Sequence, residues 1–489
     1  MDTVIAKKKH TTLKEQAVSG VKWSGISTGV ITALHFITLA VLARLLSPSD
    51  FGLMGMVMVV IGFAQVLSGM GLSNAIIQRQ DVPESHLSSF FWINVLSGIV
   101  LFVCITLIRQ IVVIYFRESS LSNYLIFAAL IFLIAPVGQI FKTLLMKELK
   151  FKTISKIEIP GMVVYSVSSI GLALAGFGVL SLIFGQLIRN IFTVIFLFFT
   201  FRKTWLPRLH FNIKEIKSYL SFGAFQMGEK TVNYLSANID YIIIGRFLGP
   251  AALGFYTLAY QIMIFPLTKI NPVITNVAFP AFSKIQDDNY RMRKGYCKAI
   301  NYISMLTFPM LAGMFVVAPE FIILVYGAKW EPTIIVLQIF CLVGIFKSLG
   351  NPVGSILLAK GRADIGFYWN VFVIIIVSIA VIVGVNWGII GVAVAILLLQ
   401  VPFFFIIQPI VNRLIDLKFS QYFKTIQSSF VCSVIMLAGV ISLKVILGKI
   451  NMLLLFITTL VAGMIIYIVS YYIKDRALFM ELKSILKGI

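Results

Sequence analysis

One short pattern occurs twice in the chain. It reads Ala43-Arg44-Leu45-Leu46-Ser47-Pro48-Ser49-Asp50-Phe51-Gly52-Leu53 and then Gly245-Arg246-Phe247-Leu248-Gly249-Pro250-Ala251-Ala252-Leu253-Gly254-Phe255. The two copies align without a gap, with Arg, Leu, Pro and Gly at matching places. Each copy lies between two apolar runs, where Pro and Gly break a helix. The pattern therefore predicts the same helix–turn–helix twice, as part of an internal repeat.

The composition places this repeat in a membrane. Of the 489 residues, 59% are hydrophobic and 12% are charged, whereas soluble domains carry about 25% charged residues. This excludes an ordinary soluble enzyme and a disordered chain. Apolar runs long enough to cross a bilayer predict an all-α polytopic protein with about 14 transmembrane helices. The predicted limits are 23–46, 51–76, 88–108, 121–141, 157–176, 178–201, 218–245, 251–280, 299–318, 333–359, 365–385, 388–411, 425–443 and 452–473.

A second, weaker internal similarity defines the length of the repeat, and the two similarities are called the first and second echo below. Lys150 and Lys152 align with Lys360 and Arg362, and Gly178 aligns with Gly388. The two echoes map helices one to six onto helices seven to twelve. Because six is even, both copies cross the membrane in the same direction. This predicts two six-helix bundles related by a parallel repeat around a central cavity, a transporter architecture that works by rocking.

The expected organisation has five segments. These are a basic cytoplasmic N-terminus at 1–22, a bundle at 23–201, a cytoplasmic linker at 202–217, a second bundle at 218–411, and two extra helices with a cytoplasmic tail at 412–489. The net charge of +22 comes from 41 Lys and Arg against 19 Asp and Glu. With the N-terminus inside, most of the basic residues fall in inner segments, as the positive-inside rule requires. Both termini are therefore expected in the cytoplasm, and the excess charge indicates a membrane rather than nucleic acid.

Four basic residues interrupt the predicted spans: Arg189, Lys230, Lys269 and Lys347. Each costs about 2.5–3.5 kcal/mol at a helix centre, so such residues face protein or a watery cavity and are functional candidates. One interpretation is a cationic cavity that binds an anionic cargo. The alternative is pairing with buried acids, and Glu229 and Asp240 are the acids within spans, where they either pair with a base or take part in coupling. Two acids are too few for four bases, which favours the cavity.

Three further residues have two interpretations each. His35 lies in the middle of the first span, where a side chain with a pKa near 6.5 can couple transport to protons or simply pack with a hydrogen bond. Arg44 and Arg246 belong to the repeated pattern and are gate candidates, or they reach the lipid headgroups at the outer ends of their spans.

Features of an enzyme are missing from the sequence. Cys104, Cys297, Cys341 and Cys432 lack metal-site spacing, so no metal and no cofactor is expected. The run from Gly223 to Thr231 resembles a phosphate-binding loop, but Glu229 stands where the lysine belongs. No external loop is large enough to hold catalytic acids. We therefore predict a secondary transporter rather than an enzyme.

The N-terminal region resembles a known family. The stretch Val18-Ser19-Gly20-Val21-Lys22-Trp23-Ser24, the first copy of the repeated pattern, and Gly71-Leu72-Ser73-Asn74-Ala75 look like the start of Wzx-type polysaccharide flippases. The resemblance is strongest to exporters of colanic and teichuronic acid repeat units. These belong to the MOP superfamily, which also holds MATE drug pumps and the lipid II flippase.

The resemblance implies a function. Such proteins sit in the bacterial cytoplasmic membrane and move an undecaprenyl-diphosphate-linked oligosaccharide to the outer leaflet by alternating access. They serve exopolysaccharide or lipopolysaccharide biosynthesis, with polysaccharide polymerase machinery as a partner. A MATE-like cation antiporter is an alternative, although that chemistry favours buried carboxylates. Two further alternatives are a lipid II flippase, and a membrane glycosyltransferase or polymerase.

Overall fold

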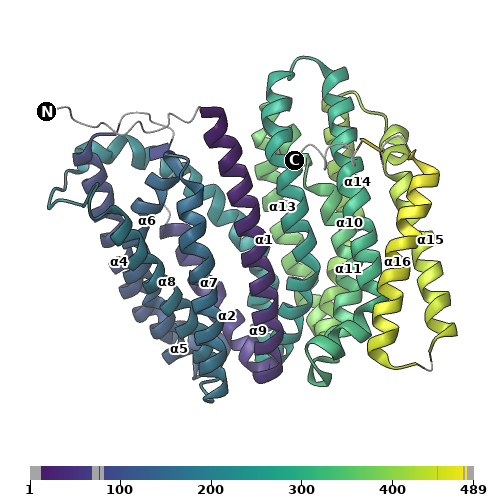
Figure 1. Cartoon of the computed structure of the whole chain (residues 1–489), viewed down its shortest axis with the longest axis horizontal. Helices are drawn as coiled ribbons and strands as arrows, with labels where there is room; N and C mark the ends of the chain where they lie inside the picture. The colour runs from purple at the N-terminus through teal and green to yellow at the C-terminus, as the bar shows by residue number, and fades with distance from the viewer. Residues whose placement is uncertain (1–12, 69–75, 78–81, 449, 477–479, 482–489) are drawn as a thin grey trace, which may run out of the picture. The chain divides into compact units, whose positions relative to one another are not determined.

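The computed structural model describes residues 13–68, 76–77, 82–448, 450–476 and 480–481. Every regular element in these ranges is a helix. The chain divides into two compact units, Met1–Leu235 and Ser236–Ile489, coloured from purple to teal and from teal to yellow in Figure 1. Their boundary falls inside helix α9, later than the linker predicted at 202–217. Most of the predicted N-terminal segment, residues 1–12, lies outside the described residues.

The first unit is a helical bundle. Its helices are α1 (Leu13–Leu45), α2 (Pro48–Ser68), α4 (Glu84–Phe116), α5 (Leu121–Ala129), α6 (Ile131–Lys147), α7 (Phe151–Leu174), α8 (Val179–Phe201) and the beginning of α9 (Ile213–Lys284). Helix α7 packs against both α1 and α8, and α6 packs against α4 and α8. Buried apolar side chains such as Phe141, Ile157 and Leu197 join α6, α7 and α8.

The second unit contains the rest of α9 and seven further α-helices. These are α10 (Asn289–Val325), α11 (Thr333–Gly350), α12 (Val353–Ala359), α13 (Ala363–Gly384), α14 (Gly388–Leu414), α15 (Phe419–Ile446) and α16 (Met452–Lys474), with short 3-10 turns at η1 (Ala328–Trp330) and η2 (Val385–Trp387). Helices α15 and α16, yellow in Figure 1, pack against each other and against α10. Cys432, Met436 and Tyr467 form the core of that contact.

Twelve stretches of the described residues are long and apolar enough to cross a membrane. Two of them, Lys230–Pro272 and Ala363–Leu414, contain a break, at Gly249 and at Val385–Trp387 respectively. The chain is thus a multi-pass helical membrane protein, and the count of 14 spans stays a prediction.

Several helices are longer than hydropathy predicted. The span predicted at 299–318 belongs to α10, which begins at Asn289 and ends at Val325. Asp288 caps its first turn by accepting a hydrogen bond from the Arg291 N–H at 3.0 Å. Hydropathy identifies only the part of a helix that is suited to lipid, whereas capping residues and tertiary packing determine where the helix ends.

The repeated pattern forms a turn in both copies. In the first copy, Ser47 and Asp50 bond reciprocally between α1 and α2: the Ser47 N–H donates to Asp50 Oδ2 at 2.8 Å, and the Asp50 N–H donates to Ser47 Oγ at 3.2 Å. In the second copy, α9 is broken at Gly249, whose φ of 79° and ψ of −178° suit a residue without a Cβ. Different side chains therefore end a helix at equivalent places, which supports the predicted repeat.

The second echo needs a correction of register. The Lys150 N–H donates to the Leu145 carbonyl at 2.9 Å, and the Arg362 N–H donates to the Leu357 carbonyl at 2.8 Å. The residues before them, Leu149 and Gly361, have positive φ values of 54° and 67°. Lys150 therefore corresponds to Arg362, and its predicted alignment with Lys360 was wrong. Helix α7 has 24 residues and α13 has 22, so the register returns at Gly178 and Gly388, as predicted.

Close packing of α4 on α6 depends on Gly98. A Cβ built on this residue would lie 2.1 Å from the Phe132 carbonyl oxygen. Gly98→Val is therefore expected to force the two helices apart and to destabilise the protein by about 1–3 kcal/mol. Thermal unfolding of the purified protein in detergent measures this effect. Gly171→Ala is the matched control, because nothing lies within 4 Å of its Cβ position. A loss of stability in the control equal to that of the Gly98 variant would contradict the steric explanation.

Candidate functional site

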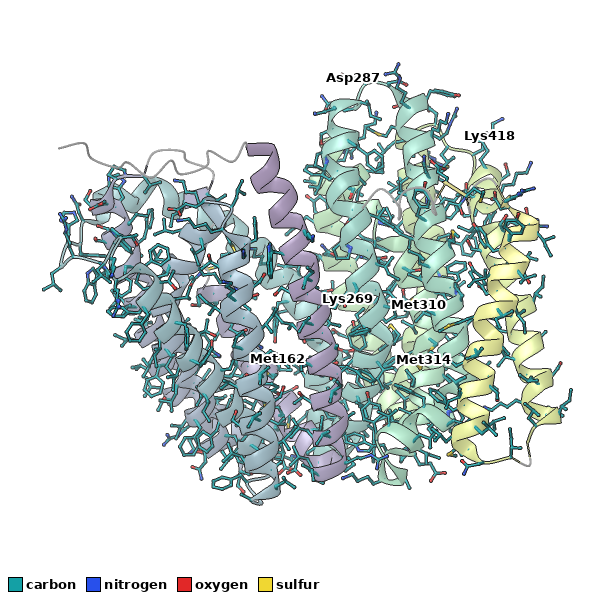
Figure 2. The ribbon with its side chains drawn as sticks, viewed as in Figure 1. Met162, Lys269, Asp287, Met310, Met314 and Lys418 are labelled. Carbon is teal, nitrogen blue, oxygen red and sulfur yellow. The ribbon has the colours of Figure 1, made fainter. Side chains whose placement is uncertain are left out.

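Arg189 lies near the middle of α8, roughly 15 Å of helix from either end. Its side chain is partly buried. The guanidinium Nη1 lies 3.8 Å from the sulfur of Met162 on α7, a residue labelled in Figure 2. A thioether is only a weak acceptor. The predicted mid-span position thus holds, and the nearest contact does not neutralise the charge.

Small residues let α7 and α8 approach each other at this position. A Cβ on Gly161 would lie 3.8 Å from Arg189 Cγ, so the aliphatic stem packs along α7. The buried Tyr165 lies close enough to interact electrostatically with the guanidinium. Within the described part of the chain, no carboxylate lies at ion-pair distance from Arg189. Among the described residues, Arg189 is therefore a cation without a counter-ion in the middle of a candidate membrane span.

Lys230 and Lys269 occupy a different environment. Both side chains are exposed on α9, and Figure 2 labels Lys269. Helix α9 continues beyond both lysines, from Ile213 to Lys284, and is broken between them at Gly249. Each lies roughly 30 Å of helix from that break, about the thickness of the hydrocarbon core. Their predicted mid-span positions stay a prediction.

Lys347 lies in a cluster with Asp240. Its ammonium donates to the Tyr260 hydroxyl at 3.0 Å and lies 4.9 Å from the centre of that ring. Asp240 is 7% exposed, and its Oδ2 accepts a hydrogen bond of 2.6 Å from the Tyr256 hydroxyl. Asp240 and Lys347 also interact electrostatically. Lys347 therefore shares a cluster with a buried acid, and each charged group is hydrogen-bonded to a tyrosine rather than to the other.

Aromatic rings hold this Asp240 cluster, which consists of Asp240, Tyr241, Tyr256, Tyr260 and Lys347. Tyr241 meets Tyr256 and Tyr260 edge-on, at centroid distances of 5.7 and 6.0 Å. Phe340 of α11 packs against the same two rings at 5.0 and 5.7 Å. The cluster therefore ties α11 to the parts of α9 before and after Gly249.

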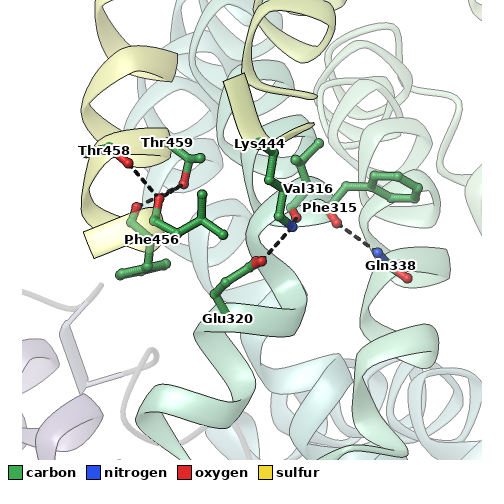
Figure 3. A network of polar contacts seen from close by, with 9 residues as sticks. Phe315, Val316, Glu320, Gln338, Lys444, Phe456, Thr458 and Thr459 are labelled. Atoms are coloured by element: carbon green, nitrogen blue, oxygen red, sulfur yellow. Dashed lines mark hydrogen bonds and ion pairs between the residues drawn. The ribbon is translucent and has the colours of Figure 1, made fainter. Parts of the chain in front are cut away.

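Sequence reasoning missed a buried ion pair between α10 and α15, shown in Figure 3. The Lys444 ammonium lies 2.8 Å from Glu320 Oε1 and also donates to the Val316 carbonyl at 2.8 Å. Glu320 is only 7% exposed. Both residues fell just outside the predicted spans, which stopped at 318 and 443. The sequence did contain a signal for this pair, since Glu320 and Lys444 lie within one turn of the ends of two predicted spans.

Other basic residues near helix ends also have partners. Lys142 of α6 pairs with Glu158 of α7. Lys298 pairs with Glu481, and this ammonium lowers the pKa of the Glu481 carboxyl. Arg189 differs from these residues, because no acid among the described residues pairs with it.

The remaining predicted residues are not brought together into one site. His35 and Arg44 are exposed on α1, and Arg246 is partly buried three residues before the break in α9. All three interact with neighbours. The side chain of Glu229 lies outside the described residues. Coupling by His35 or Glu229 and gating by Arg44 and Arg246 stay predictions.

Comparison with known proteins places the chain among polysaccharide biosynthesis proteins. A family model with that description matches residues 41–335. The teichuronic acid biosynthesis protein TuaB of Bacillus subtilis (strain 168) is 36% identical over 438 residues, covering 88% of this chain and 89% of TuaB. The lipopolysaccharide biosynthesis protein WzxC of Escherichia coli (strain K12) is 36% identical over 431 residues, covering 86% of each.

The fold also matches a solved transporter. The lipid II flippase MurJ, in an inward closed conformation, aligns with a TM-score of 0.74 over 94% of this chain and 99% of MurJ. The sequence identity is 16%, so this likeness shows the fold alone. Together with the two relatives, it confirms the predicted fold class. The chain belongs to the polysaccharide biosynthesis protein family, in agreement with its resemblance to Wzx-type flippases.

Proposed function

We propose that this chain is a flippase for an undecaprenyl-diphosphate-linked oligosaccharide repeat unit. It moves the unit from the inner to the outer leaflet of the bacterial cytoplasmic membrane by alternating access, for surface polysaccharide biosynthesis. TuaB is named for teichuronic acid biosynthesis and WzxC for lipopolysaccharide biosynthesis, and MurJ, with the same fold, is named as a lipid II flippase. The relatives' names refer to different polymers, so the sugar of the cargo is left open.

The observation that carries this proposal is the unneutralised charge of Arg189. A diphosphate that crosses the hydrocarbon core must exchange its water for other partners, because a bare anion there is very costly. A guanidinium binds phosphate oxygens through two parallel hydrogen bonds. In the part of the chain that the structure describes, Arg189 has no carboxylate to compete for its donors. We assign it the role of the mid-membrane contact for the diphosphate.

The other basic residues receive different roles in this proposal. Lys230 and Lys269, both exposed and each roughly 30 Å of helix from the break at Gly249, attract the anionic headgroup where it enters or leaves the hydrocarbon core. Lys347 is balanced by Asp240, so it belongs to the Asp240 cluster rather than to the cargo contact. The polyprenyl tail stays in lipid. The concentration of Lys and Arg in the predicted inner segments supports cytoplasmic termini.

The test is a translocation assay in proteoliposomes. The lipid-linked oligosaccharide is extracted from the host and incorporated together with the purified protein. Membrane-impermeant periodate then oxidises only the sugars on the outside. The proposal predicts that all of the lipid becomes accessible with the protein, and only the outer-leaflet fraction without it. Equal accessibility in the two preparations would contradict a flippase.

A further inference from the structure

Asp240 and Lys347 share one buried cluster without forming a close ion pair. Both side chains are described, and their charged atoms are not within ion-pair distance. Each is hydrogen-bonded to a different tyrosine instead: Asp240 accepts from Tyr256 at 2.6 Å, and Lys347 donates to Tyr260 at 3.0 Å. The two charges attract each other through the cluster, but neither depends on the other for its hydrogen bonds.

The second unit also contains a closed pair for comparison. Glu320 and Lys444 are in direct contact at 2.8 Å, and Lys444 has a carbonyl as its second acceptor. Removing the charge of either partner there breaks a hydrogen bond and leaves a buried ion. In the Asp240 cluster, neutralising Asp240 breaks no hydrogen bond of Lys347. The geometry therefore lets the carboxylate change its charge without rebuilding the site.

From this geometry we propose that Asp240 is a proton-binding site that takes up and releases a proton in each transport cycle. The ionised form is held by the Tyr256 hydroxyl, the Tyr241 N–H at 3.0 Å and the field of Lys347. The neutral form avoids the cost of burying a carboxylate. It still bonds to Tyr256, because a hydroxyl can donate or accept. The proton comes from water, binds a carboxylate oxygen of Asp240 and returns to water.

Protonation changes the forces between two helices. In the ionised state, Asp240 on α9 attracts Lys347 on α11, and the cluster is neutral overall. In the protonated state this attraction is lost, and the cluster carries the single positive charge of Lys347. Among the described titratable side chains, Tyr256 of α9 bonds to Asp240 and Lys347 of α11 acts on it electrostatically, while Tyr241 and Tyr260 of α9 complete the cluster. Proton uptake therefore loosens α11 from α9, a change that can be linked to transport.

The proton site is tested first without any cargo. Infrared difference spectra of the purified protein in lipid, between mildly acid and mildly alkaline pH, detect the carbonyl band of a protonated carboxylic acid. The wild type is expected to show such a band, and Asp240→Asn is expected to lose it. Absence of the band in the wild type, or its persistence in Asp240→Asn, would overturn the proposal.

The role in transport rests on the proposed function and is tested in the periodate assay. Asp240→Asn combined with Lys347→Met leaves no unpaired charge, so this double variant serves even where a single variant fails to fold. It is expected to lose the response of translocation to an imposed pH gradient. Glu320→Gln with Lys444→Met is the matched control and is expected to keep that response.

The outcomes separate the two proposals. A double variant of Asp240 and Lys347 that responds to the gradient as the wild type does would make the pair structural only, and would overturn the inference. A wild type that moves no lipid would contradict the flippase, whereas the infrared band would still decide whether Asp240 binds a proton.

Discussion

Replacing Arg189 with glutamine is expected to lower translocation by at least ~10-fold, because hydrogen bonds to a charged group contribute about 1.5–3 kcal/mol. The variant should fold normally. The Arg189 guanidinium contacts Met162 and interacts electrostatically with Tyr165, and its removal leaves no acid unpaired among the described residues. The periodate assay measures the activity, and thermal unfolding in detergent measures the stability.

Two further variants test whether the effect of Arg189→Gln depends on the paired donors of Arg189 and on its position. Arg189→Lys keeps the charge but loses the paired donors, so it should retain part of the activity. Arg208→Gln removes a charge of the same type from a side chain that is 81% exposed, and it should be fully active. Wild-type activity in Arg189→Gln would remove Arg189 from the cargo path, though it would leave the family assignment intact.

Replacing Glu320 with alanine is expected to destabilise the protein by about 3–5 kcal/mol, the usual cost of leaving one partner of a buried ion pair alone. Lys444, whose side chain is 23% exposed, would keep only the Val316 carbonyl. Helices α15 and α16 should detach from α10 at a lower temperature. Unfolding curves in detergent, followed by circular dichroism, give the change in stability.

The controls for Glu320 separate burial from charge. Glu320→Gln combined with Lys444→Met removes both charges and should restore most of the stability, because no ion is then left alone. Glu148→Ala breaks a pair with Lys150 in which the acid is 47% exposed, and it should cost about 0–1 kcal/mol. A loss in Glu148→Ala as large as in Glu320→Ala would contradict the role given to burial.

Local signals made much of the fold predictable. The first turn is formed by Ser47, Pro48 and Asp50, and the second by Gly249 and Pro250. In both turns, the local conformations of these residues determine where the helix ends. Helix ends were less predictable. Helix α10 continues through polar residues that no hydropathy scale assigns to a span. The second echo was aligned in the wrong register at Lys150 because α7 is two residues longer than α13. Only the hydrogen bonds of Lys150 and Arg362 reveal this difference.

The candidate site was predictable only in part. Arg189 was identifiable because a charge in the middle of an apolar run has a cost regardless of its neighbours. The partners of Lys347 and Lys444 were not, because Asp240 and Glu320 are far away in sequence. Pairing depends on which helix faces meet, and alternation of apolar and polar residues does not determine that.

The central claim is that the chain flips a lipid-linked oligosaccharide for surface polysaccharide. The most direct measurement is mass spectrometry of polyprenyl-linked oligosaccharides in the host after deletion of the gene, together with an assay of surface polymer. The account predicts a build-up of one undecaprenyl-diphosphate oligosaccharide and loss of the matching polymer, both reversed by the wild-type gene and not by Arg189→Gln. Unchanged lipid intermediates with intact surface polymer, in a host with no second flippase of this family, would contradict it.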